Sequence, residues 1–251
     1  MTSNEKGVNE AELSLTEHLA ELRTRLIRSV VAVAVGFCIS YAFIRPIFAF
    51  LSLPLLQVLP PGTSLIFTSY PEAFFTYLKL ALTAGLFLAS PFILHEIWAF
   101  IAPGLYPHER KWALPFIFFS SLFFIGGAIF GYFAVFPAAF SFLASYAGAD
   151  LKLLPSVSEY FSLTIKLLLG FGAAFELPIF MVFMALVGII DAKMLRKNRK
   201  YALLIIFIIA AVITPTPDVV NQCLLAGPLL ILYEISIILV ALIGKRTRHQ
   251  G

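Results

Sequence analysis

Long apolar runs alternate with short polar stretches along the whole chain. We predict six membrane-spanning helices, over the ranges 26–45, 73–100, 112–138, 160–188, 201–214 and 219–243. A helix needs roughly 20 apolar residues to cross the hydrocarbon core of a bilayer. The runs are continuous and do not alternate residue by residue, which argues against a transmembrane β-barrel. The pattern therefore predicts an all-α polytopic membrane protein.

The fifth and sixth runs differ from the other four. A helix over residues 201–213 would be only about 20 Å long at roughly 1.5 Å per residue. The proline-rich motif TPTPD at 214–218 ends that helix, and Pro228 is expected to kink the next one. We expect a short helical hairpin that either lies below the far membrane surface or thins the bilayer around it.

Charge supports this assignment and orients the chain. Of the 251 residues, 60% are hydrophobic and 13% are charged, whereas soluble domains carry about a quarter charged residues. Most Lys and Arg residues precede the first run, separate the second from the third and the fourth from the fifth, or follow the sixth. The positive-inside rule then places these segments and both termini in the cytoplasm.

The remaining segments define a simple domain organisation. We predict a polar N-terminal tail at 1–13, a single six-helix transmembrane domain at 14–243 and a basic cytoplasmic tail at 244–251. Residues 46–71 contain five prolines and are expected to form an ordered cap outside the membrane.

The segment SLTEHLAELRTRL, residues 14–26, predicts an amphipathic helix that leads into the first run. Its leucines recur at intervals of four, three and four residues, which places them on one helix face. Glu21 and Arg25 lie on the other face, four residues apart. From periodicity alone, the segment is an interfacial helix with pairs of acidic and basic residues.

Four motifs along the chain resemble the TatC family, the multispanning subunit of twin-arginine (Sec-independent) protein translocases. They are HLAELRTRL at 18–26, WAFIAPGLYPHER at 98–110, FGAAFELP at 171–178 and TPTPDVVNQCLLAGPLLILYE at 214–234. Their order and spacing match the family over about residues 14–243. The polar lead, Glu96 and Lys166 depart from the family pattern. The resemblance implies a concave, glove-like bundle of six helices in the cytoplasmic (inner) membrane of a prokaryote.

The resemblance also implies a function. Family members recognise signal peptides with two consecutive arginines, and they export folded proteins with the proton-motive force. The implied partners are these signal peptides, TatA- and TatB-type single-span proteins, further copies of the chain and the lipid bilayer, but not nucleic acid. The resemblance implies no enzyme activity and no cofactor. We expect no metal site either, because HEIWAF at 95–100 lacks the second histidine of an H-E-x-x-H zinc motif.

The implied signal-peptide site is cytoplasmic. Its predicted residues are Glu21, Arg23, Phe100, Tyr106 and Glu109. Carboxylates accept guanidinium groups in charge-assisted, often bidentate, hydrogen bonds, so Glu21 and Glu109 suit a pair of arginines. Alternatively, Glu109 pairs with its basic neighbours in a rigid turn, and the two aromatic residues belong to an interfacial belt. The predicted structural loop positions are Pro54, Pro91, Pro103, Gly104 and Pro107.

Glu176 is the most informative charge inside an apolar run. A carboxylate at such depth costs several kcal/mol unless it is paired, hydrated or protonated. The family match predicts that it contacts signal peptide or a polar residue of a TatA-type partner, and the alternative is a structural hydrogen bond between helices. The predicted intramembrane polar positions are Glu176, Asp218, Gln222 and Glu234. Asp218 has a second interpretation as the N-cap of the sixth helix.

A proton-coupled small-molecule transporter that uses Glu176 is the alternative function. The intramembrane charges and the broken sixth run suit such a protein. However, the two halves of the chain show no matching pair of broken helices, which is the usual sign of a transporter built from repeats.

Overall fold

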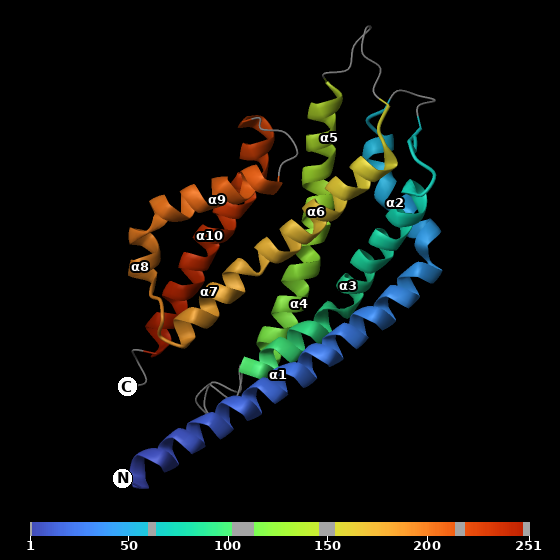
Figure 1. The fold of residues 1–251 in the computed structure, drawn as a ribbon. Helices are drawn as coiled ribbons and strands as arrows, with labels where there is room; N and C mark the ends of the chain where they lie inside the picture. The colour runs from blue at the N-terminus through green and yellow to red at the C-terminus, as the bar shows by residue number, and fades with distance from the viewer. Residues whose placement is uncertain (1, 60–63, 102–112, 146–153, 214–218, 248–251) are drawn as a thin grey trace.

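The computed structural model describes residues 2–59, 64–101, 113–145, 154–213 and 219–247, which are helical almost throughout (Figure 1). The helices are α1 (Thr2–Ala42), α2 (Ile44–Leu56), α3 (Glu72–Ile101), α4 (Ala113–Phe130), α5 (Phe136–Ala144), α6 (Val157–Phe175), α7 (Leu177–Leu186), α8 (Ala192–Lys197), α9 (Arg199–Ile213) and α10 (Val219–Thr247). A π-helical turn, Gly131–Val135, joins α4 to α5. Within these ranges the only β-structure is an isolated bridge between Ile66 and Ser156, so the predicted all-α class is confirmed.

Five helical segments are long and apolar enough to cross a membrane. They are Thr16–Ala42, Glu72–Ile101, Leu114–Ala144, Val157–Leu186 and Gln222–Leu242. The predicted fifth run corresponds to α9, which has 15 residues and is short, as its sequence indicates. The total of six spans and the cytoplasmic position of both termini therefore stay predictions.

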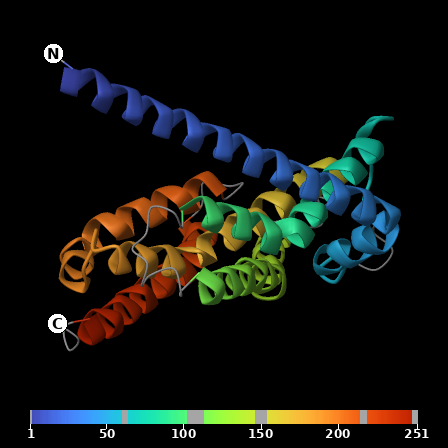
Figure 2. The same ribbon diagram turned by 90° about the horizontal axis from the view of Figure 1, so that it is seen from below.

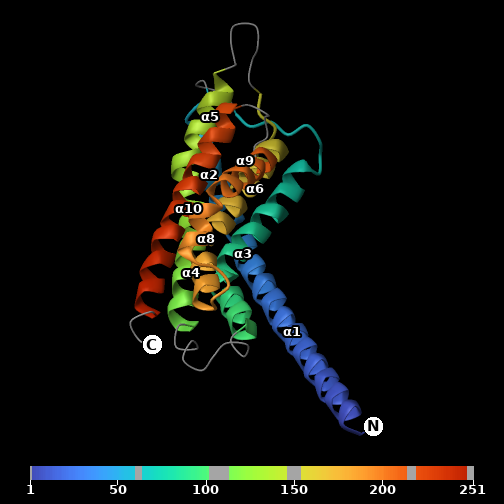
Figure 3. The same ribbon diagram turned by 90° about the vertical axis from the view of Figure 1, so that its left-hand side faces the viewer.

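The helices form two groups around a central pair. Figure 1 shows α1 and α3 on one side of the molecule, α8, α9 and α10 on the other, and α4 and α6 between them. The first helix begins at Thr2 and continues without a break to Ala42, so residues 2–13 are helical. Its N-terminal part extends beyond the other helices, as Figures 2 and 3 show. The division into tail, membrane domain and basic C-terminal tail stays a prediction.

Pro54 lies inside α2 and not in a loop, which corrects the sequence-based assignment. A proline has no N–H group, so the carbonyl of Phe50, four residues earlier, loses its helical hydrogen bond. The hydroxyl of Tyr132 donates to this carbonyl at 2.5 Å, and the Tyr132 ring stacks on Phe50 with centroids 4.6 Å apart. The proline thus creates an acceptor through which a distant helical segment is attached to α2.

Pro91 is likewise inside a helix, α3, and not in a loop. Here the carbonyl of Phe87 is freed, and the adjacent Ser90 hydroxyl donates to it at 2.7 Å. Within membranes, hydroxyl side chains commonly donate to the carbonyl that a helix proline leaves without its hydrogen bond, because no water is present in the hydrocarbon core to do so. Both prolines therefore keep their structural role, with helical positions.

Glu72 joins the start of α3 to the start of α6. One carboxylate oxygen accepts from the Ser156 hydroxyl at 2.6 Å and from the Ser158 amide at 2.8 Å. The other accepts from the amides of Thr68 and Ser69 at 2.6 and 3.2 Å. The isolated bridge connects the same two segments. One side chain thereby satisfies the backbone donors of two turns that are distant in sequence.

Removing the Tyr132 hydroxyl should lower stability more when Pro54 is present than when it is replaced. Tyr132→Phe keeps the stacked ring but leaves the Phe50 carbonyl without its donor, which should cost about 1 kcal/mol of unfolding free energy. In a Pro54→Ala background the new N–H restores the helical bond, so the same change should cost less. Thermal unfolding of the purified protein in detergent measures both.

Tyr70→Phe is the matched control for the loss of a hydroxyl, because Tyr70 is fully exposed. It should leave the melting temperature unchanged. An equal effect of Tyr132→Phe in the presence and absence of Pro54 would contradict the proposed compensation.

Candidate functional site

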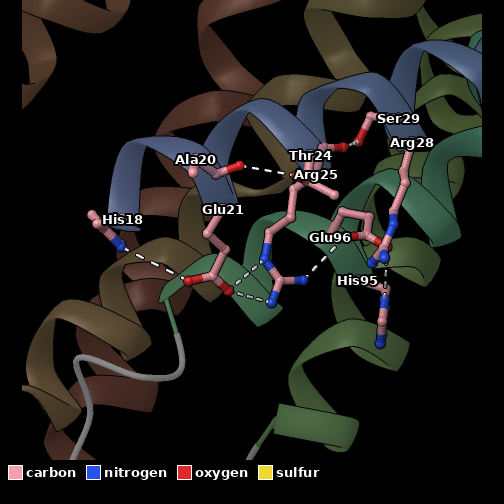
Figure 4. Close-up of polar contacts among 9 residues, drawn as sticks. All are labelled: His18, Ala20, Glu21, Thr24, Arg25, Arg28, Ser29, His95 and Glu96. Carbon is pink, nitrogen blue, oxygen red and sulfur yellow. Dashed lines mark hydrogen bonds and ion pairs between the residues drawn. The ribbon is translucent and has the colours of Figure 1, made fainter. Parts of the chain in front are cut away.

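A cluster of acidic and basic side chains lies where the middle of α1 packs against the end of α3 (Figure 4). The guanidinium of Arg25 donates to Glu21 through Nε at 2.9 Å and through Nη2 at 2.5 Å. Its third nitrogen, Nη1, donates to Glu96 at 3.0 Å. One arginine therefore bridges two carboxylates, one on its own helix and one 71 residues away.

Helix packing explains how these residues meet. The two helices run antiparallel, and their backbones touch at Gly36 and Gly85, where a Cβ atom on either glycine would lie 2.5 Å from the other helix. Arg25 precedes Gly36 by 11 residues, and Glu96 follows Gly85 by 11 residues. Eleven residues are about three helical turns, so both side chains return to the contacting face at the same height.

The two acids of the cluster differ in exposure. Glu96 is 4% exposed, whereas one third of the Glu21 side chain is accessible. Arg28 and His95 each place a nitrogen 3.9 Å from the second oxygen of Glu96. Glu96 is thus an enclosed acid with basic neighbours, and Glu21 is the acid that a ligand can reach.

Glu21 also borders a pocket of about 380 Å³. Its lining residues are Ala20, Glu21, Thr24, Arg25 and Arg28. Close by, the His18 ring stacks on Phe100 with centroids 4.3 Å apart, and its Nδ1 lies 4.0 Å from Glu21. The structure therefore brings together two of the predicted signal-site residues, Glu21 and Phe100, through His18.

The other predicted signal-site residues have different outcomes. Arg23 is exposed on α1. Tyr106, Glu109 and the loop residues Pro103, Gly104 and Pro107 lie outside the described residues, so their placement stays a prediction.

Sequence reasoning does not assign Arg25 and Glu96 to the site. From the sequence, Glu96 stands out only as a departure from the family pattern. Its signal is an acidic residue in an otherwise apolar run, which requires a partner, and Arg25 four residues after Glu21 could supply one.

Glu176 lies between α6 and α7, within a membrane-spanning segment. The Ser120 hydroxyl on α4 donates to one of its carboxylate oxygens, so the structural interhelical bond expected as an alternative is present. Among the described residues, its other oxygen, Oε1, has no hydrogen-bond partner. Glu176 therefore combines a structural bond with an acceptor left for another group.

Gln222 and Glu234 both tie α10 to neighbouring chain segments. The Gln222 amide donates to the Phe207 carbonyl at 2.9 Å, and Glu234 forms an ion pair with Arg199 at 2.6 Å. Asp218, the remaining predicted intramembrane position, lies outside the described residues. The described pair thus stabilises the packing of α9 against α10.

The sequence matches the family model of the Sec-independent protein translocase protein TatC over residues 17–228. The chain belongs to the TatC family. It is 48% identical to the TatC protein of Desulforapulum autotrophicum over 237 residues, which is 94% of this chain and 87% of the relative. It is 41% identical to that of Escherichia coli (strain K12) over 223 residues, which is 89% of this chain and 86% of the relative.

The structural comparison agrees. The crystal structure of the twin arginine translocase receptor TatC in DDM superposes with a TM-score of 0.81 at 41% identity, covering 89% of this chain and 99% of that chain. A second crystal structure of the same receptor gives a TM-score of 0.78 at 42% identity, covering 88% of this chain and 97% of that chain. The chain is therefore a multi-pass membrane protein of a translocase family, and TatC proteins are translocase subunits, not enzymes.

The glycine contact that aligns the site predicts a specific sensitivity. Gly85→Ala should lower the melting temperature, because the new Cβ would lie 2.5 Å from the Phe37 amide nitrogen and would force α1 away from α3. Gly126→Ala on α4 is the matched control, since no heavy atom lies within 4 Å of the place that its new Cβ would take. That change should be neutral or stabilise by about 0.5–1 kcal/mol. Equal stability of the two variants would contradict this account of the contact.

Proposed function

We propose that this chain is a receptor for signal peptides with two consecutive arginines, within a translocase that exports folded proteins by means of the proton-motive force. The observation that carries the proposal is the pair of hydrogen bonds that one Glu21 carboxylate oxygen, Oε1, accepts from the guanidinium of Arg25, at the edge of a pocket. A carboxylate that binds the guanidinium of Arg25 in this way can bind the guanidinium of a peptide arginine in its place. The crystal structures that match this fold are those of a twin arginine translocase receptor, which supports the same function.

Glu109 is the second acid of the proposed site, and Phe100 supplies an apolar contact for the peptide. Arg23 and Tyr106 complete the patch. The site faces the cytoplasm of a prokaryotic cell whose inner membrane contains the protein with both termini inside. The basic residues of the connecting segments support this proposed orientation.

TatA- and TatB-type single-span proteins are the proposed partners, together with further copies of the chain. The unpaired oxygen of Glu176 supports a contact with a polar residue of such a partner helix. A polar pair inside a bilayer is favourable because lipid offers neither group an alternative partner. Asp218, Gln222 and Glu234 are proposed to support this partner surface. The family comparisons favour this function over the small-molecule transporter left as an alternative by the sequence.

The test of the receptor function is binding of a twin-arginine peptide to the purified full-length protein. Glu21→Gln and Glu109→Gln should each weaken binding about tenfold, because each removes a charge-assisted hydrogen bond to the ligand. Glu17→Gln is the matched control on the same helix, since Glu17 is exposed. Fluorescence anisotropy of a labelled peptide gives the dissociation constants.

A peptide with two lysines tests recognition of the guanidinium group. Lysine retains the charge but lacks the planar fork of donors, so this peptide should bind more weakly. If neither acid affects binding, or if the lysine peptide binds as well, the receptor function is wrong.

The partner contact has a separate test. Glu176→Ala should reduce co-purification of TatA- and TatB-type proteins with this chain, because their polar groups lose the unpaired acceptor. Glu159→Ala is the control, since Glu159 is exposed near the N-terminus of α6, the helix that Glu176 follows. Unchanged co-purification of a folded Glu176→Ala variant would refute the contact.

A further inference from the structure

The cluster on α1 and α3 has a property that the proposed receptor function does not require. Its accessible acid, Glu21, is already occupied by a guanidinium of the same chain. Phe100, which we propose as an apolar contact for the peptide, is stacked against the His18 ring. The free receptor therefore holds groups of its own against both residues.

Arg25 occupies one carboxylate oxygen of Glu21. Its Nε and Nη2 both donate to Oε1, at 2.9 and 2.5 Å. A peptide arginine cannot form a bidentate contact, which uses both oxygens of Glu21, until Arg25 releases Oε1. Bidentate signal binding at Glu21 thus requires an exchange of one guanidinium for another.

Glu96 makes this exchange feasible. Arg25 is already bonded to it through Nη1 at 3.0 Å, and the side chain of Arg25 is only one fifth exposed. A charge left without a partner in such a place is strongly destabilising. With Glu96 present, Arg25 can release Glu21 and remain paired.

The remaining charged neighbours do not replace Glu96. Arg28 and His95 each lie 3.9 Å from Glu96. His18 lies 4.0 Å from Glu21. All three are basic, so none of them can accept the guanidinium of Arg25.

We propose that Glu96 is a positioning residue for signal recognition: it retains Arg25 while a peptide arginine takes its place on Glu21. This inference rests on the proposed receptor function. It also identifies a source of selectivity, because a ligand must compete with a guanidinium that is held on Glu21 by two hydrogen bonds. A lysine ammonium is a point charge without the planar fork and competes poorly.

The test compares the wild type with Glu96→Gln, Arg25→Gln and the double variant, each as purified full-length protein with twin-arginine and twin-lysine peptides. Glu96→Gln should weaken twin-arginine binding about tenfold, because among the described residues Arg25 then has Glu21 as its only carboxylate partner. Arg25→Gln should strengthen binding at least about threefold and reduce the preference for arginine over lysine. The double variant should bind at least as well as the wild type.

Rescue distinguishes this role from a structural one. If Glu96 only held α3 in place, adding Arg25→Gln would not restore binding. Arg28→Gln removes a positive charge from the same pocket without clearing Glu21, so it should strengthen binding less than Arg25→Gln. An equal gain would assign the effect to general charge and overturn the inference. Glu96→Asp, which keeps the carboxylate, should retain most of the affinity.

The outcomes distinguish failure of the receptor function from failure of the role proposed for Glu96 alone. If the wild type does not prefer the arginine peptide, or if Glu21→Gln binds normally, the receptor function and this inference both fail. If Glu21→Gln loses binding but Arg25→Gln gains none and the double variant is not rescued, only this inference is wrong. If Glu96→Gln fails to fold, Arg25→Gln and the double variant can still be measured, because neither retains an Arg25 charge that needs Glu96. The inference is then wrong if Arg25→Gln does not strengthen binding or if the double variant binds more weakly than the wild type.

Discussion

The backbone contact between α1 and α3 is the constraint on which the candidate site depends. Gly36 and Gly85 let the two helices touch, and this contact fixes their relative height. Small residues are typical of such interfaces because van der Waals packing, and not the hydrophobic effect, holds helices together in lipid. Three turns away, the same register places Arg25 opposite Glu96. A change in the glycine contact would therefore alter the electrostatics of a site that contains neither glycine.

A second principle recurs in the rest of the fold: backbone groups without helical partners are satisfied by side chains, from other elements or from the same helix. The Tyr132 hydroxyl donates to the carbonyl freed by Pro54, and the Glu72 carboxylate accepts hydrogen bonds from backbone amides of two turns. Inside or near a membrane, water is a poor substitute for such partners. The polar side chains that stabilise the fold are accordingly those beside prolines and helix starts, where the helical bonding pattern is interrupted.

Much of this architecture could be predicted from the sequence, since continuous apolar runs and basic loops reflect the bilayer directly. The helical class and the short α9 follow from run length and proline positions. The interior positions of Pro54 and Pro91 could not be predicted in this way. Whether a proline ends a helix or is tolerated within it depends on a donor for the freed carbonyl. For Pro54 this donor is Tyr132, from a distant part of the chain, and for Pro91 it is the adjacent Ser90.

The candidate site shows the same limit. The spacing of Glu21 and Arg25 predicts their ion pair, because residues four apart share a helix face. The link to Glu96 spans 71 residues and depends on where α1 and α3 cross, which periodicity does not specify. Glu176 is comparable: its apolar surroundings indicate that it needs a partner, but only packing selects Ser120.

The pairing of Arg25 with two acids connects stability with recognition. A receptor whose exposed carboxylates stood free in the resting state would attract any cation near the membrane surface. When Arg25 is paired with Glu21 and Glu96, and Arg28 lies beside Glu96, the charges of the two acids are balanced and the enclosed acid is paired. On the proposed exchange, a ligand binds only if it matches the geometry of the group that it displaces. Selectivity for arginine arises, on this view, as much from the competitor as from the acid that both groups share.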